Sequence, residues 1–342
     1  MDIQEVILRK QIDFNNEWPK IRSFSSEATQ TFENRLKENK IEQLFEPIKL
    51  EKDKALEYFM EHKDISKIFS SILDTFDMLP MHPDLAFDVV WRTLEISLKY
   101  LSLKSWSFSA DKGFEQILKK GCDDVIAPYC DSDENVRKMF EMLFSNVSLA
   151  SLRYLVARLF FRMELSVSPQ VDYVRGRAEH LLGKDALKAI HSKYVDSTGD
   201  MNAANQHKAA CLIRLILQGR DVDINGVKLK SLNLSKRVEL YVSCVLYSSR
   251  CERFHGDHYS PLKSSLTDLG TYYEYYYFLL FSYTLWGLFM NKIQNALSSL
   301  NVFDIEAIFE SIKASFDKLK VLPNLKSATI IQYTIKGRFM SR

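Results

Sequence analysis

The fold is organised around residues 238–258, VELYVSCVLYSSRCERFHGDH, where an apolar run passes abruptly into a charged one. The first ten residues are apolar on nearly every side, which is typical of a helix buried inside a bundle. Gly256 is a predicted helix stop, because glycine readily adopts the left-handed conformation that ends helices. The stretch therefore predicts a buried helix with a basic cluster at its C-terminal end: Arg250, Arg253, His255 and His258.

The composition indicates a mainly helical globular protein. The chain has 342 residues, 46% of them hydrophobic, which is enough to bury a sizeable core. It has only 11 Gly and 8 Pro and is rich in Leu, Lys, Glu and Phe, a composition that favours helices over sheets. The formal net charge of +2 excludes a global basic field of the kind that binds nucleic acid indiscriminately. Any site for a polyanion must therefore be local.

The cysteines and the N-terminus indicate a cytoplasmic protein. Five cysteines are scattered without a C-x-x-C pair, which fits a reducing compartment better than a disulfide framework. The N-terminus is charged and has no apolar signal core. Residues 275–290 carry no charge, but they are too few for a membrane span and rich in tyrosine. We expect them to form a buried core or interface helix, and we expect no membrane partner.

We predict an all-α fold, a helical bundle with one small β-hairpin insertion at 222–229, where Asn225-Gly226 between β-branched residues favours a two-residue turn. Pro80 and Pro83 mark a boundary, with Asp84 as a possible N-cap for the next helix. The predicted parts are an N-terminal helical extension (1–80), a helical domain (81–300) and a C-terminal helix with its tail (301–342). The predicted helices cover about 26–45, 51–79, 85–103, 113–128, 135–143, 149–163, 170–182, 185–194, 201–217 and 305–319.

A long aromatic helix follows the charged cluster. Ser264 or Ser265 can cap it, and it runs to about residue 300 with aromatic side chains over most of its circumference. A helix that is apolar all round must be covered on all sides. We therefore infer that a second subunit buries one of its flanks, as in a homodimer.

The spacing of Arg250 and His255, followed by Gly256 and preceded by Leu246-Tyr247, resembles the R-x4-6-H motif of the HEPN (higher eukaryotes and prokaryotes nucleotide-binding) superfamily. The form L-Y-x-x-R-x-x-x-x-H-G, as in Apea-like and abortive-infection proteins, is similar. The resemblance implies a HEPN-like helical core and a homodimer in which two motifs face each other across a cleft. It also implies metal-independent cleavage of RNA without a cofactor.

Family members often carry an alcohol or an acid in their first helix, a position that Glu95 matches, although a surface carboxylate is the more common role for such a residue. Many also place Asn, Asp or His directly after the arginine, where this chain has Cys251. A thiol is the poorer hydrogen-bonding group. A second copy of the spacing, Arg175 to His180, lacks the preceding apolar helix.

The side chains suit one reaction, attack of an RNA 2′-hydroxyl on the adjacent phosphate. Arg250 stays charged and its planar fork matches phosphate oxygens, while His255 titrates near neutrality and can transfer a proton. On an unbroken helix, five residues turn through about 500°, so these two side chains would point about 140° apart. Either the helix ends near Phe254 or a partner shares the site. Candidate supporting or RNA-binding residues are Tyr247, Cys251, Glu252, Arg253 and His258.

Other interpretations stay open. Cys251, His255 and His258 form a C-x3-H-x2-H pattern, but a zinc site would need a fourth ligand. A nucleophilic Cys251 would need an orienting acid behind the histidine. The cluster could also only solvate a helix end, or belong to a non-catalytic HEPN module that binds nucleotides or proteins. The resemblance further implies a bacterial toxin or antiphage effector that cuts tRNA or mRNA, with an antitoxin or regulatory protein as a possible partner.

Overall fold

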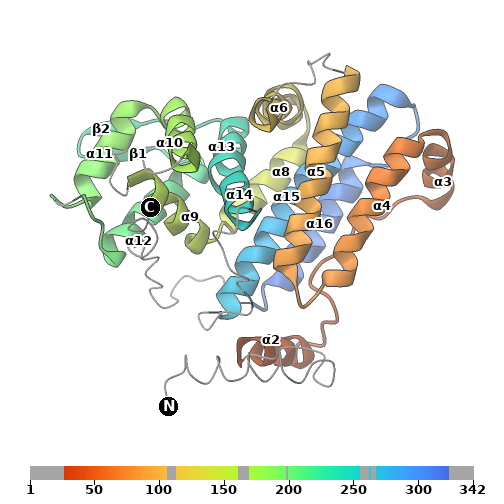
Figure 1. Cartoon of the computed structure of the whole chain (residues 1–342), viewed down its shortest axis with the longest axis horizontal. Helices are drawn as coiled ribbons and strands as arrows, with labels where there is room; N and C mark the ends of the chain where they lie inside the picture. The colour runs from red at the N-terminus through yellow and green to blue at the C-terminus, as the bar shows by residue number, and fades with distance from the viewer. Residues whose placement is uncertain are drawn as a thin grey trace.

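The computed structural model describes residues 27–105, 113–160, 169–197, 199–254, 262 and 267–322. Helices make up most of these residues, and the regular sheet among them is one two-stranded antiparallel hairpin (Figure 1). The predicted all-α class and the predicted hairpin are both confirmed. None of the described helices combines the length and the apolar character that crossing a membrane requires.

Three described helices precede the long helix α5, and α15 is the longest described helix. In chain order the α-helices are α2 (Glu27–Glu38), α3 (Lys52–Glu61), α4 (Lys63–Met78), α5 (Pro83–Ser105), α6 (Phe114–Gly121), α7 (Ala127–Ser132), α8 (Glu134–Ser145), α9 (Leu149–Phe160), α10 (Pro169–Leu182), α11 (Lys184–Tyr194), α12 (Ala203–Leu217), α13 (Leu234–Tyr241), α14 (Tyr247–Phe254), α15 (Leu269–Leu297) and α16 (Ile305–Leu319). Two π-helical turns, η1 (Cys122–Ile126) and η2 (Val242–Leu246), join α6 to α7 and α13 to α14.

The hairpin pairs β1 (Val222–Ile224) with β2 (Val227–Leu229). Its two turn residues, Asn225 and Gly226, have φ angles of 53° and 85°. Positive φ at both central residues defines the turn whose twist matches that of a two-stranded ribbon, which is why Asn-Gly predicts it. The Asp223 carboxylate accepts a hydrogen bond of 2.9 Å from the Gly226 N–H and closes the turn. The hairpin packs on α11 and α12 at one end of the molecule (Figure 1).

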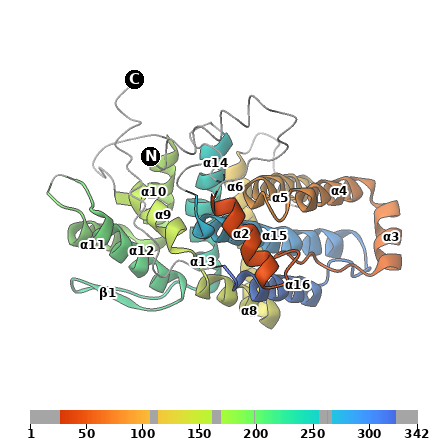
Figure 2. The same ribbon diagram turned by 90° about the horizontal axis from the view of Figure 1, so that it is seen from below.

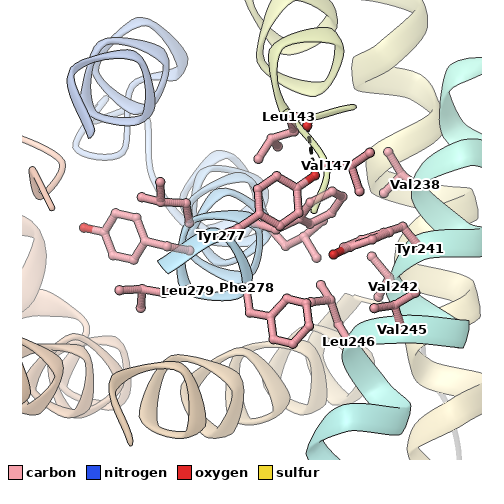
Figure 3. Close-up of a cluster of buried hydrophobic side chains, with 14 of the residues drawn as sticks. Leu143, Val147, Val238, Tyr241, Val242, Val245, Leu246, Tyr277, Phe278 and Leu279 are labelled. Atoms are coloured by element: carbon pink, nitrogen blue, oxygen red, sulfur yellow. Dashed lines mark hydrogen bonds between the residues drawn. The ribbon is translucent and has the colours of Figure 1, made fainter. Parts of the chain in front are cut away.

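Helix α15 lies at the centre of the larger helical group, with α5, α16 and α2 packed around it (Figures 1 and 2). Residues 276–290 are all buried and Tyr275 is partly buried. The prediction that the uncharged run 275–290 is a core helix is therefore confirmed. Tyr277 and Phe278 of α15 meet side chains of α13, η2 and α8 in one apolar cluster, shown in Figure 3.

Described residues of the chain itself cover the flank of α15 that the sequence predicts to be buried by a second subunit. The Tyr272 ring stacks on Phe32 of α2 with centroids 4.0 Å apart, and the Tyr277 hydroxyl donates to the Leu143 carbonyl at 2.9 Å. The Ile48 N–H donates to the Tyr283 hydroxyl at 3.1 Å, so the non-helical segment before α3 also lies on this helix. The prediction that a second subunit buries a flank of α15 is therefore wrong, and the homodimer stays a prediction of the resemblance alone.

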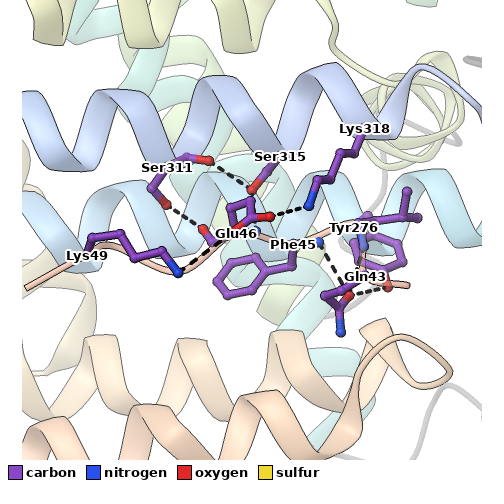
Figure 4. Close-up of polar contacts among 9 residues, drawn as sticks. Gln43, Phe45, Glu46, Lys49, Tyr276, Ser311, Ser315 and Lys318 are labelled. Carbon is purple, nitrogen blue, oxygen red and sulfur yellow. Dashed lines mark hydrogen bonds and ion pairs between the residues drawn. The ribbon is translucent and has the colours of Figure 1, made fainter. Parts of the chain in front are cut away.

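The non-helical segment before α3 is bound to α16 through Glu46 (Figure 4). The Glu46 N–H donates to the Ser315 hydroxyl at 2.8 Å, and the Ser311 hydroxyl donates to the Glu46 carbonyl at 2.5 Å. The Glu46 carboxylate also pairs with Lys318. An extended segment like this has no helical periodicity, so its coverage of α15 could not be read from spacing.

Several predicted helix boundaries were wrong. The helix expected over 26–45 ends at Glu38, so residues 39–45 belong to the non-helical segment before α3. The helix expected over 51–79 is two helices that meet at His62. Helix α5 begins at Pro83, because proline suits the first helical position, and Asp84 lies in its first turn instead of at the N-cap. Helix α15 is capped by Asp268 in a capping box with Thr271, while the proposed caps Ser264 and Ser265 lie outside the described residues.

The predicted buried helix over 238–247 is confirmed, but it contains a π turn. Helices α13 and α14 are continuous through η2, and Val238, Leu240 and Tyr241 are fully buried. A π turn accommodates one extra residue, so the residues after it are rotated by about 100° relative to a regular helix. The turn therefore sets which way Arg250, on α14, points.

Candidate active site

Arg250 lies on α14 and pairs with Glu95 on α5. Its Nη2 lies 3.1 Å from Glu95 Oε2, and the two side chains are 22% and 21% exposed. The other carboxylate oxygen, Oε1, accepts a hydrogen bond of 2.8 Å from the indole Nε1 of Trp91, one turn earlier in α5. One carboxylate thus holds a guanidinium on one oxygen and an indole on the other.

The Trp91 ring anchors this arrangement in the core. Trp91 is fully buried, and its ring contacts Phe87, Phe114 and Tyr247 with centroids 6.1 to 6.4 Å apart. A side chain fixed by packing orients the hydrogen-bond partner that it holds. The orientation of Arg250 is therefore set from the core through Trp91 and Glu95, two residues that lie over 150 positions away in the chain.

The finding changes the interpretation of Glu95. The sequence offers two roles for this residue, a match to the first-helix acid of HEPN proteins and the more common role of a surface carboxylate. The structure places it in an ion pair at the boundary between core and solvent, directly beside the motif arginine. The i, i+4 spacing of Trp91 and Glu95 was the one local signal that this carboxylate has a buried partner.

Tyr247 is the first residue of α14 and belongs to a group of rings next to Arg250. Its ring lies 5.8 Å from Phe114 and 5.6 Å from Tyr173, and its hydroxyl is 3.5 Å from Glu115 Oε1. Burial raises the pKa of Tyr247, and the neighbouring Cys251 and Glu115 raise it further. The phenol therefore stays neutral at physiological pH and acts as a hydrogen-bond donor.

Glu252 links α14 to α9 through an ion pair. Its carboxylate pairs with Arg158, whose guanidinium lies over the Tyr154 ring at 3.3 Å from the ring centroid. The Arg158 carbonyl in turn accepts a hydrogen bond of 3.1 Å from Arg175 Nε. Glu252, which we had considered for a supporting role, therefore holds the motif helix in place.

Cys251 is buried and in its thiol form. Burial raises its pKa, although hydrogen bonds to Tyr247 and Arg250 act in the opposite direction. The thiolate is both the nucleophile and the metal ligand form of cysteine, so this environment disfavours both of the cysteine-based interpretations. The residue instead contacts Tyr247 and Arg250.

The remaining candidate residues lie outside what the structure describes. His255, Gly256 and His258 are not among the described residues, and of Arg253 only the backbone is described. The geometry of Arg250 relative to His255 thus stays a prediction, as does the C-x3-H-x2-H alternative. Within the described ranges, no three His, Cys, Asp or Glu side chains gather as a metal site.

The second copy of the spacing is described completely. Arg175 and His180 lie on one continuous helix, α10, where Arg175 is partly buried against Arg158 and His180 is exposed. Five residues on a continuous helix place the two side chains about 140° apart. The two side chains therefore cannot hold one phosphate together.

A buried ionic network behind the motif was not predicted. Glu239, the second residue of the apolar run, is 1% exposed and pairs with Arg177 of α10 and with Lys236 at 2.7 Å. The hydrogen bond to Glu239 raises the pKa of Lys236. A charge inside an apolar sequence was the available signal, because a buried carboxylate requires a partner. The network fixes α13 against α10.

Comparison of the chain with family models, with curated proteins and with solved structures finds no match in any of the three.

Proposed function

We propose that the protein is a metal-independent endoribonuclease of the HEPN type, in which Arg250 and His255 act on an RNA phosphodiester. The observation that supports this most is the Arg250–Glu95 pair at the end of a buried helix, only about a fifth exposed to solvent. Charge stabilisation by a fixed guanidinium is stronger at such a boundary than in open water, because the surrounding dielectric is lower.

Each side chain has a distinct task in the proposed reaction. A guanidinium carries five N–H donors in a rigid plane, so Arg250 can bind a phosphate oxygen while Glu95 fixes its orientation. His255 takes or gives the proton of the 2′-hydroxyl or of the leaving oxygen. The nucleophile is part of the substrate, so the reaction forms a 2′,3′-cyclic phosphate and a free 5′-hydroxyl without a cofactor.

The biological setting follows from the same resemblance. HEPN ribonucleases of this kind are toxins or antiphage effectors that act as homodimers, and we propose the same role here, with an antitoxin or regulatory protein as a further partner. The N-terminal extension (1–80) and the C-terminal part (301–342) are candidate regulatory segments in this proposal.

A non-catalytic role in nucleotide or protein binding is the second candidate. The observation that favours it is that Arg250 and Glu252 are both engaged in ion pairs that stabilise the position of α14. A binding module would retain RNA without cutting it. The two candidates therefore differ in whether products form.

The test is a digest of total cellular RNA by the purified protein with EDTA present. We expect cleavage by the wild type, and a loss of about 10²-fold or more in Arg250→Ala and in His255→Ala, which is the usual cost of removing a charge-stabilising or proton-transferring group. Arg220→Ala, an exposed arginine just after α12, is the matched control and should cleave normally. Unchanged cleavage in either site variant would refute the assignment, and bound but intact RNA would favour the binding module.

A further inference from the structure

Three aromatic side chains from three different helices reach the surface beside Arg250. Phe114 of α6, Tyr173 of α10 and Tyr247 of α14 are each partly exposed, so the described residues cover none of these rings completely. The Tyr247 ring lies between the other two, with centroid distances of 5.8 Å to Phe114 and 5.6 Å to Tyr173. We call these three rings the aromatic group. It offers a surface on which a flat aromatic ligand can pack.

An exposed carboxylate lies at the edge of the aromatic group. Glu115 follows Phe114 in the first turn of α6, and its Oε1 is 3.5 Å from the Tyr247 hydroxyl. Burial raises the pKa of Tyr173 and Glu115 adds to the rise, so this carboxylate lies close to both phenols. Among the described residues Glu115 has no basic partner, in contrast to Glu95, which pairs with an arginine. Both of its oxygens can therefore accept from a ligand.

The Tyr247 hydroxyl is also able to bind a ligand. A contact of 3.5 Å is at the limit of hydrogen bonding, so the hydroxyl can turn to a better-placed acceptor. Together, Tyr247 and Glu115 present one donor and two acceptors. The Watson–Crick edge of guanine presents the opposite set, because O6 accepts while the N1–H and N2–H groups donate.

Guanine is the one RNA base that matches all three groups. Adenine matches at most two of them, through N1 and its 6-amino group. Cytosine and uracil each place an acceptor against a carboxylate oxygen, in either orientation of the base. A buried or half-buried polar group that is left unpaired disfavours the wrong base. The set of donors and acceptors therefore selects for guanine.

The aromatic group lies next to the arginine of the candidate site. Tyr247 and Arg250 are three residues apart on α14, about 4.5 Å along the helix axis and on neighbouring faces. The Trp91 ring contacts Tyr247 with centroids 6.4 Å apart, and its indole N–H donates to Glu95. Glu95 in turn holds Arg250. A base on the aromatic group therefore lies close to a phosphate bound by Arg250.

We propose that the aromatic group and Glu115 form a guanine-binding subsite. The base packs on the rings, the Tyr247 hydroxyl donates to O6, and the Glu115 carboxylate accepts from N1–H and N2–H. Proteins recognise unstacked RNA bases by the same two means, stacking on aromatic side chains and hydrogen bonds along the Watson–Crick edge. The inference rests on the proposed function where it takes the guanine from RNA, in which case a guanine flanks the phosphate that is cut. A free guanine nucleotide presents the same base, so the experiment has an arm for each source.

The first arm measures binding of nucleoside monophosphates to the purified protein by isothermal titration calorimetry, each as its 3′ and its 5′ phosphate. Guanosine monophosphate should bind about tenfold or more tightly than the adenosine, cytidine and uridine monophosphates. Inosine monophosphate lacks only the 2-amino group of guanine. It should bind about fivefold or more weakly than guanosine monophosphate, because one hydrogen bond to the carboxylate is lost.

Variants separate recognition of the base edge from packing. Glu115→Gln and Tyr247→Phe keep the size of the side chain, and each should weaken guanosine monophosphate by about tenfold while adenosine monophosphate changes by less than about threefold. Tyr173→Leu should weaken all the nucleotides by similar factors, since it removes a ring but keeps apolar bulk. Glu57→Gln is the matched control, an exposed carboxylate on α3 at the opposite end of the molecule from α10 (Figures 1 and 2). It should bind normally, and circular dichroism confirms that each variant is folded.

The second arm uses RNA. Cuts mapped in the digest of cellular RNA should have a guanine on one side of the cut phosphate. Replacing that guanine by inosine in a synthetic oligonucleotide should lower kcat/KM by about fivefold or more, and Glu115→Gln should bring the ratio between the two oligonucleotides close to one.

The outcomes separate this inference from the proposed function. Equal binding of guanosine and adenosine monophosphates, or a guanine preference that Glu115→Gln leaves intact, would overturn the subsite. Cleavage with no base preference beside the cut would also refute the subsite and would keep the nuclease. Selective binding of guanosine monophosphate by a protein that leaves RNA intact would refute the nuclease and keep the subsite, with a free guanine nucleotide as its ligand.

Discussion

Glu95 is the residue on which the geometry of the candidate site depends. It joins Trp91, locked in the core, to Arg250, which borders solvent. Because the carboxylate accepts from both partners at once, it holds the guanidinium through Nη2 before any substrate arrives. Preorganisation of this kind is what makes a charged group effective in a transition state.

Replacing Glu95 by Gln should therefore lower RNA cleavage by about tenfold or more while the fold is kept, because the amide retains the size of the side chain but not its charge. Glu95→Ala should in addition lower the free energy of unfolding by about 1–3 kcal/mol, since Arg250 loses its partner in a partly buried position. Cleavage rates and denaturant melts measure the two effects. Glu134→Gln, which disrupts a surface pair with Lys138, is the control and should change neither quantity.

Glu274 on α15 gives the protein a pH-dependent stability. Burial raises the pKa of its carboxyl group to about 8, Asp268 adds to the rise, and Arg153 partly offsets it. The folded state therefore binds more protons than the unfolded state between pH 4.5, the ordinary value, and about 8. Stability from this group falls as pH rises through that window and is constant above it.

We accordingly expect the wild type to lose about 1–2 kcal/mol more stability than Glu274→Gln between pH 6 and pH 8, because the amide cannot ionise. Urea unfolding at the two pH values measures the difference, and using the same buffers for both proteins removes the contribution of all other titrating groups. Equal losses in the two proteins would show that Glu274 ionises normally.

At the scale of elements, the close packing of α5, α6 and α15 depends on Gly121 at the end of α6. A Cβ atom built there would lie 2.8 Å from Leu98 of α5 and 3.1 Å from Phe289 of α15. Both neighbours are buried, so neither can move away without disturbing the core. The helix that precedes η1 can therefore approach the central pair only with glycine at this position.

Gly121→Ala should lower the free energy of unfolding by about 1–3 kcal/mol through overpacking. Gly176→Ala in α10 is the matched control, since a Cβ there meets nothing within 4 Å. It should raise stability by about 0.5–1 kcal/mol, because alanine is the better helix former. Thermal or denaturant unfolding measures both changes in the free energy of unfolding. A destabilised Gly176→Ala or a neutral Gly121→Ala would contradict the packing described.

For the whole molecule, the sequence predicted correctly the features that depend on residues close together in the chain. The buried run before Arg250, the apolar helix over 275–290 and the Asn225-Gly226 hairpin each depend on neighbours in sequence, and each is confirmed. The coverage of α15 was predicted wrongly, because residues 39–50 cover it as a non-helical segment with no periodicity.

The candidate site was predictable only in part. The sequence identified Arg250 but could not predict its contact with Glu95, because these two residues are 155 positions apart in the chain. The π turn η2 also changes the direction in which α14 faces, and no regular helical spacing anticipates it. Long-range contacts and helix irregularities are set by packing across the molecule, which a single helical wheel does not represent.

The central claim is that the RNA supplies its own nucleophile to a site built on Arg250. The most direct measurement uses the site mapped in the RNA digest, placed in a short synthetic oligonucleotide that carries either a ribose or a single 2′-deoxyribose at the cut. The account predicts that the all-ribose oligonucleotide yields a 2′,3′-cyclic phosphate end with EDTA present, and that the 2′-deoxy substitution abolishes cleavage. Cleavage of the substituted oligonucleotide at an undiminished rate would contradict the claim.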